Sequence, residues 1–201
     1  MIYIHPAPVR LWHWVNAAGF IVLILTGVQI RFADIFNFMN LKDAVTIHNW
    51  VGFLVIGNYL LWFGYYFGTG RIKIYIPNLK TFVPKAIAQA KYYGFGIFKG
   101  DHNPHEMSPG NKFNAMQQQA YLSLMLLLLP LQMISGVLLW DVAKFKTAID
   151  MVGGLQLLDT LHVLLFYFFG SFMLVHAYLA SLGHTPTAHY KAMITGWEEE
   201  H

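Results

Sequence analysis

Four long apolar segments constrain the fold of this chain more than any other feature. We expect them to form helices over residues 10–32, 45–68, 114–140 and 155–182, with a kink at Pro130. Each is long enough to cross a bilayer, whose ~30 Å hydrocarbon core takes about 20 residues of helix. In lipid the backbone N–H and C=O groups must be satisfied internally, which a helix achieves within one segment. The sequence therefore predicts an all-α integral membrane four-helix bundle.

Composition supports a membrane protein and limits the metal chemistry. Apolar residues make up 56% of the 201 residues and charged residues 11%, against about a quarter charged in soluble domains. The chain has no cysteine, which excludes disulfides, cysteine-ligated iron–sulfur clusters and c-type haem attachment. Any metal centre must therefore use histidine, carboxylate or methionine ligands. We find no repeat or composition change, and predict a single transmembrane domain over 1–201.

The distribution of basic residues predicts the orientation. Seven of the thirteen Lys and Arg residues lie in the connection 69–113, and short loops rich in Lys and Arg stay in the cytoplasm. We therefore expect this connection and both termini to be cytoplasmic in a multi-pass protein of the bacterial inner membrane. The stretch LKTFVPKAIAQAKYYGFGIFKG within it has the spacing of an amphipathic helix lying along the inner surface. The net charge of +3 then reflects topology and not nucleic-acid binding.

Four of the ten histidines fall within or at the edge of the apolar segments. His13 and His176 are expected near the inner surface, and His48 and His162 near the outer one. Ionisable residues inside membrane segments are functional candidates by default. The alternative is that each is only hydrogen-bonded within the bundle, but their arrangement in two layers favours ligation.

The spacing in the fourth segment indicates what is ligated. His162 and His176 are fourteen residues apart, close to four helical turns, so they share a face about 21 Å apart. They cannot converge on one ion as the ligands of a zinc site do. Each layer can instead supply two axial imidazoles to its own haem b, with iron bound by all four histidines in two pairs. Small residues that would admit the macrocycle are Gly19, Gly27, Gly52, Gly57, Gly136 and Gly170.

Several motifs resemble those of one family. They are RLWHW at Arg10–Trp14, HNWVG from His48, GNKFNAMQQ at Gly110–Gln118, the histidine pair of the fourth segment, and AMITGW at Ala192–Trp197. The chain resembles the di-haem cytochrome b (gamma) membrane subunits of formate dehydrogenase, nickel–iron hydrogenase and thiosulfate reductase-type complexes. The resemblance pairs His48 with His162 at the outer haem and His13 with His176 at the inner haem.

The resemblance also implies a function and further site residues. Such a subunit transfers electrons across the membrane between quinone (menaquinone or ubiquinone) and a periplasmic iron–sulfur or multihaem subunit, itself joined to a catalytic subunit of a respiratory oxidoreductase. Asn114 and Gln117 would bind the quinone carbonyl through hydrogen bonds, although Met116 stands where the family typically has glycine. Arg10 would pair with a haem propionate.

Two other functions are compatible with the same histidines. One is a stand-alone transmembrane reductase of ascorbate or ferric iron, and the other is a haem-free transporter with a histidine proton relay. The chain lacks the inverted repeats that many transporters show. Histidines outside the apolar segments are interpreted as solvated loop residues, although two groups have metal-binding spacing: His102 and His105 near Glu106, and His184 with His189.

Overall fold

Four helices long and apolar enough to cross a membrane form the body of the protein. The computed structural model describes residues 1–105, 113–183 and 185–198. The spans are α1 (Ala7–Arg31), α2 (Leu41–Gly68), Ala115–Trp140 and α8 (Leu155–Ala180). The third consists of α5 (Ala115–Ser123), a π-helical turn η3 (Leu124–Leu128) and α6 (Leu129–Trp140). The predicted all-helical membrane architecture is confirmed.

Asparagine side chains fix where several helices begin. Asn40 accepts a hydrogen bond from the Lys42 amide at 2.9 Å, so α2 starts four residues before the predicted position. Asn78 accepts from the Lys80 amide at 3.1 Å and starts α3 (Leu79–Lys91). Such side chains satisfy amides that have no partner within the first helical turn. The amphipathic stretch predicted in the 69–113 connection is helical over 79–99, with a π-helical turn at Tyr92–Gly96.

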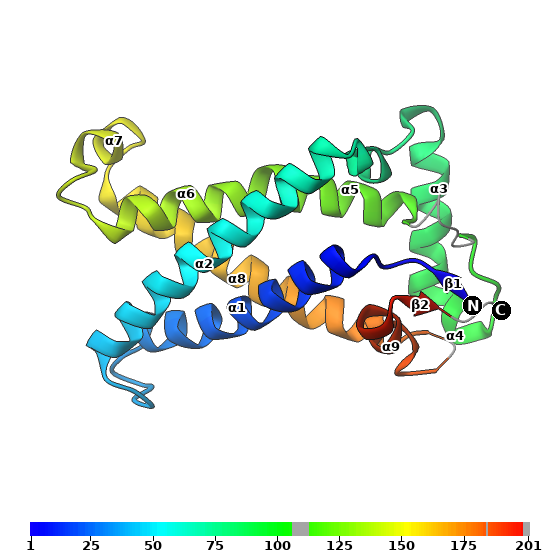
Figure 1. Cartoon of the computed structure of the whole chain (residues 1–201), viewed down its shortest axis with the longest axis horizontal. Helices are drawn as coiled ribbons and strands as arrows, with labels where there is room; N and C mark the ends of the chain where they lie inside the picture. The colour runs from blue at the N-terminus through cyan, green and yellow to red at the C-terminus, as the bar shows by residue number, and fades with distance from the viewer. Residues whose placement is uncertain (106–112, 184, 199–201) are drawn as a thin grey trace.

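The helices lie side by side with different connections at the two ends (Figure 1). α1 packs mainly against α2, and α6 against α8. One end holds the turn between α1 and α2 and the short helix α7 (Lys146–Met151). The other end holds α3, α4 (Ile97–Lys99), α9 (Ala188–Thr195) and both termini. The termini and the long connection therefore share one end of the bundle.

The two termini are joined by contacts that the sequence did not predict. β1 (Ile2–Tyr3) pairs antiparallel with β2 (Trp197–Glu198). The Arg10 guanidinium donates to the Ile194 carbonyl, and Trp14 Nε1 donates to the Met193 carbonyl at 3.2 Å. These bonds attach the start of α1 to α9.

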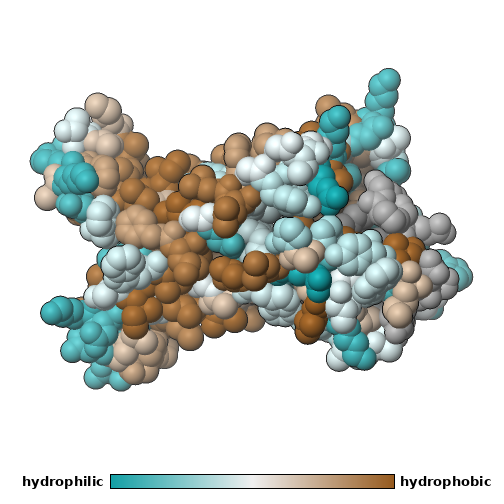
Figure 2. Space-filling model, in the orientation of Figure 1, coloured by the Kyte–Doolittle hydropathy of each residue, from teal (hydrophilic) through white to brown (hydrophobic). Residues whose placement is uncertain are grey.

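The surface matches a protein embedded in lipid. Apolar residues cover the middle of the molecule, and hydrophilic residues gather at both ends (Figure 2). Large apolar side chains on the spans are exposed, among them Leu61 at 73% and Leu174 at 71%. Monomeric soluble proteins rarely expose apolar surface on this scale, so it marks the face that contacts lipid.

The expected irregularity at Pro130 takes the form of a π-turn. The Leu129 amide donates to the Leu124 carbonyl, five residues back. It therefore does not donate to the Met125 carbonyl, its usual acceptor in an α-helix. Pro130 has no N–H, so it cannot donate to the Met125 carbonyl either. The Tyr59 hydroxyl of α2 donates to that carbonyl at 2.9 Å in a buried site. A neighbouring helix thereby satisfies the Met125 carbonyl, which Pro130 and the π-turn leave without a donor in its own helix.

We predict that Tyr59→Phe destabilises the bundle by about 1–2 kcal/mol, because it leaves a buried carbonyl without a donor. The measurement is unfolding in mixed micelles of detergent and denaturant. Tyr167→Phe on the exposed face of α8 is the matched control and should leave stability unchanged. Equal stability of the two variants would show that the Tyr59 hydrogen bond contributes nothing.

Candidate functional site

The structure brings the four membrane histidines together in two pairs. The ring centroids of His13 (α1) and His176 (α8) lie 6.2 Å apart, with 55° between the ring planes. Those of His48 (α2) and His162 (α8) lie 6.4 Å apart, with 67° between the planes. These are the two pairs expected from the sequence. We call them the inner pair and the outer pair respectively.

Both separations suit two axial ligands of one metal. An imidazole nitrogen binds a metal at about 2.0–2.1 Å and lies ~1.1 Å from its ring centre, so opposed imidazoles hold their centroids roughly 6.3 Å apart. The helices that carry each histidine pair are also not the ones that pack most closely. The closest packing is between α1 and α2 and between α6 and α8. Facing side chains on well-separated helices leave room for a flat macrocycle within a bundle.

A hydroxyl group on α1 orients the imidazole of His48. Thr26 Oγ1 lies 2.8 Å from His48 Nδ1 and also donates to the Val22 carbonyl at 2.7 Å. Since the hydroxyl hydrogen is used by the carbonyl, Oγ1 accepts the Nδ1–H of the ring. Gly27 follows, and a Cβ there would lie 3.6 Å from His48 Cε1. The ring therefore presents its lone pair at Nε2.

His162 is held in the same way by α6. Ser135 Oγ lies 2.8 Å from His162 Nδ1 and donates to the Gln132 carbonyl at 3.0 Å. A Cβ at the adjacent Gly136 would lie 3.2 Å from His162 Cε1. The Gln132 amide nitrogen lies 3.2 Å from His162 Nε2, and donates there if Nδ1 carries the proton. Iron would take the place of this donor at Nε2.

Thr26 and Ser135 were not predicted from the sequence. Both are almost fully buried, 1% and 2% exposed, and each precedes a glycine that was singled out. A hydroxyl–glycine dipeptide facing a membrane histidine is a signal that could have found them. Of the other glycines, Gly19 serves helix packing, since a Cβ there would meet Val55 Cγ2 at 2.6 Å. The other three predicted positions, Gly52, Gly57 and Gly170, have open space where a Cβ would lie.

Aromatic rings pack against the inner pair. Phe172 stacks on His176 with centroids 5.8 Å apart and 9° between planes. Trp14 meets His13 edge-on at 5.1 Å. These contacts limit the rotation of both rings.

The match to a protein family agrees with this geometry. The family model of the prokaryotic cytochrome b561 covers residues 4–196. The chain belongs to this family. It is a b-type cytochrome that transfers electrons in the membrane. The family implies haem b, and two pairs of facing imidazoles at these separations fit that cofactor.

Individual relatives of this cytochrome are named as cytochromes or as subunits of redox enzymes. The cytochrome YdhU of Escherichia coli K12 is 32% identical over 206 residues, 98% of this chain and 74% of that protein. The YedZ1 protein of Azospira oryzae, named as a protein-methionine-sulfoxide reductase subunit, is 22% identical over 89% of this chain and 90% of its own length. A Cupriavidus necator protein named as a Ni/Fe-hydrogenase B-type cytochrome subunit is 61% identical over 28 residues, 14% of this chain and 12% of its own. No solved structure gives a significant match.

Asn114 and Gln117 form a capping box at the start of α5. Asn114 Oδ1 accepts from the Gln117 amide at 2.9 Å, and Gln117 Oε1 accepts from the Asn114 amide at 3.0 Å. Asn114 Nδ2 donates to the Tyr93 hydroxyl at 3.0 Å. Burial raises the pKa of Tyr93, and the bond from Asn114 acts in the opposite direction. Both amides therefore have a structural role; residues 110–112 of the GNKFNAMQQ motif lie outside the described residues.

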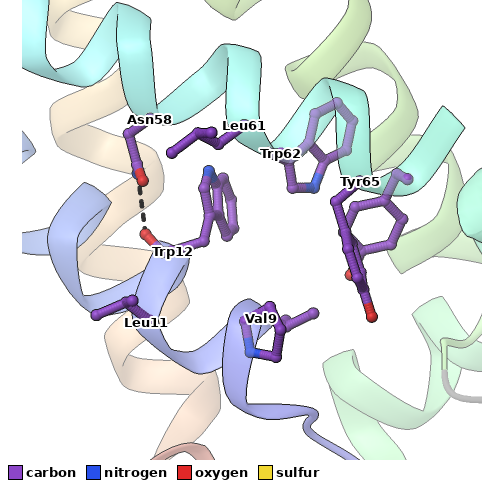
Figure 3. A pocket seen from close by; sticks show the side chains of 9 residues that line it. Val9, Leu11, Trp12, Asn58, Leu61, Trp62 and Tyr65 are labelled. Carbon is purple, nitrogen blue, oxygen red and sulfur yellow. Dashed lines mark hydrogen bonds between the residues drawn. The ribbon is translucent and has the colours of Figure 1, made fainter. Parts of the chain in front are cut away.

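A largely apolar cavity of about 280 Å³ lies between α1 and α2. Figure 3 shows Trp12, Trp62 and Tyr65 around it, with Asn58 Nδ2 donating to the Trp12 carbonyl at 3.0 Å.

Among the described residues, the remaining histidines form no comparable site. In the part of the chain that the structure describes, no group of three or more His, Cys, Asp or Glu residues could hold a metal ion. His189 Nδ1 lies 3.0 Å from the Glu198 carboxylate, which gives it a local partner. Glu106 and His184 of the predicted loop groups lie outside the described residues.

Proposed function

We propose that this cytochrome carries electrons across the membrane through two b haems. The inner haem would be ligated by His13 and His176, and the outer one by His48 and His162. The observation that carries the proposal is that both pairs have the centroid separation of axial ligands. Each haem would supply a one-electron carrier, and the whole chain, 1–201, would serve as one cytochrome domain.

Orientation and partners follow from charge and from the relatives. The end that holds the 69–113 connection and both termini is proposed to be cytoplasmic, because that connection is rich in Lys and Arg. The outer pair would then exchange electrons with a periplasmic redox subunit and its catalytic partner. The names of the relatives as hydrogenase and reductase subunits support assembly with such a partner.

The inner pair would exchange electrons with quinone from the membrane. Asn114 and Gln117 lie at the end of the bundle that holds the termini, where the inner haem would be, and remain the proposed quinone site. Arg10 is proposed to reach an inner propionate, since its Nη1 is engaged by Ile194 but its buried Nε has no hydrogen-bond partner in the described structure.

We predict two haems per purified chain, and the loss or severe perturbation of a different one in His48→Ala and in His176→Ala. Each substitution removes one axial nitrogen, so only the layer that contains it should change. Pyridine haemochrome assay and dithionite-reduced spectra measure this, with the exposed loop variant His102→Ala as the control. One haem in the parent, or both haems intact in either variant, would contradict the pairing.

The quinone site can be tested without breaking the helix start. Asn114→Ser combined with Gln117→Glu keeps a Ser-x-x-Glu capping box but removes both amide donors. We expect α5 to stay intact, and a quinone analogue to perturb the spectrum of the inner haem only at higher concentration than in the parent. Gln119→Glu on the exposed side of α5 is the control. Unchanged titration in the double variant would place the quinone elsewhere.

A further inference from the structure

We propose that Thr26 and Ser135 are positioning residues of the outer haem that hold both axial imidazoles as Nδ1–H donors and lower that haem's reduction potential. This inference rests on the proposed ligation by His48 and His162. The two residues come from α1 and α6, which carry no ligand of that haem. All four spans would therefore build the outer site.

The location of the protons follows from the hydrogen bonds. A hydroxyl has one hydrogen, and in Thr26 and Ser135 it lies between Oγ and a backbone carbonyl of the same helix, at 2.7 and 3.0 Å. The oxygen can then only accept from the imidazole at 2.8 Å. Nδ1 is therefore the protonated nitrogen in both rings, and Nε2 is the ligating one.

Simple helix packing does not account for this arrangement. A Ser or Thr in a membrane helix satisfies itself by bonding to a carbonyl three or four residues back, as Thr46 does with the Lys42 carbonyl at 2.8 Å. Thr26 and Ser135 make that bond and also reach an imidazole. In each case a glycine follows beside Cε1 of the same ring: a Cβ at Gly136 would crowd His162 Cε1 at 3.2 Å, and one at Gly27 would touch His48 Cε1 at 3.6 Å. The repeated hydroxyl–glycine arrangement is the specific feature.

The electronic consequence has a definite sign. An acceptor at Nδ1–H draws the proton away from the ring, which raises the basicity of Nε2 as a metal ligand. A more basic ligand stabilises ferric over ferrous iron and lowers the potential. Both hydroxyls are 1–2% exposed, so water cannot replace either one. Because both axial ligands of one haem are polarised, the two effects fall on the same redox couple.

The test is a spectroelectrochemical titration of the purified cytochrome. In the double variant Thr26→Val plus Ser135→Ala we expect the reduction potential of one haem to rise by ~59 mV, which is a tenfold change in the ferrous-to-ferric ratio of a one-electron couple. The other haem should keep its potential. Each single variant should give part of the shift, and Thr26→Ser should stay close to the parent. Thr46→Val, which removes a similar hydroxyl two residues from His48, is the matched control.

The possible outcomes separate this inference from the proposed function. Loss of one haem with the other intact in the double variant would also support positioning by the hydroxyls. Unchanged potentials, or equal shifts in both haems, would overturn the inference. Retention of both haems by His48→Ala would instead contradict the ligation itself.

Discussion

The structure depends on one constraint: a polar group inside a lipid-embedded bundle must find its partner within the protein. The Met125 carbonyl, left over by the π-turn and Pro130, is satisfied by the Tyr59 hydroxyl. The Nδ1–H of His48 and that of His162 are satisfied by hydroxyls of neighbouring helices. Each of these bonds joins two spans, so the contacts that satisfy polar groups also set how the helices pack.

The two histidine layers have different surroundings. The outer rings donate hydrogen bonds to Thr26 and Ser135, whereas the inner rings lie against Phe172 and Trp14. In both layers α8 supplies one ring and a helix of the α1–α2 pair supplies the other. A haem in each layer would therefore join the α1–α2 pair to the α6–α8 pair. It would add contacts between two helix pairs that otherwise pack against each other at few points.

The main features of the fold could be predicted because they follow from short-range rules. Span lengths come from hydropathy, and the two layers come from helical rise and alternating direction. The hydroxyl partners could not be predicted, since they depend on how one helix is rotated against another. The pairing of β1 with β2 joins residues at opposite ends of the chain and leaves no local signal. The role of Asn114 in a capping box was also missed, although its spacing to Gln117 was visible in the sequence.

The central claim, two bis-histidine layers in one chain, is tested most directly by low-temperature EPR of the oxidised protein. Two axial imidazoles make ferric haem low-spin, whereas loss of one ligand leaves a high-spin site. The account predicts two distinct low-spin ferric signals that integrate to two spins per chain. A single low-spin signal, or a stoichiometric high-spin signal in the parent protein, would contradict it.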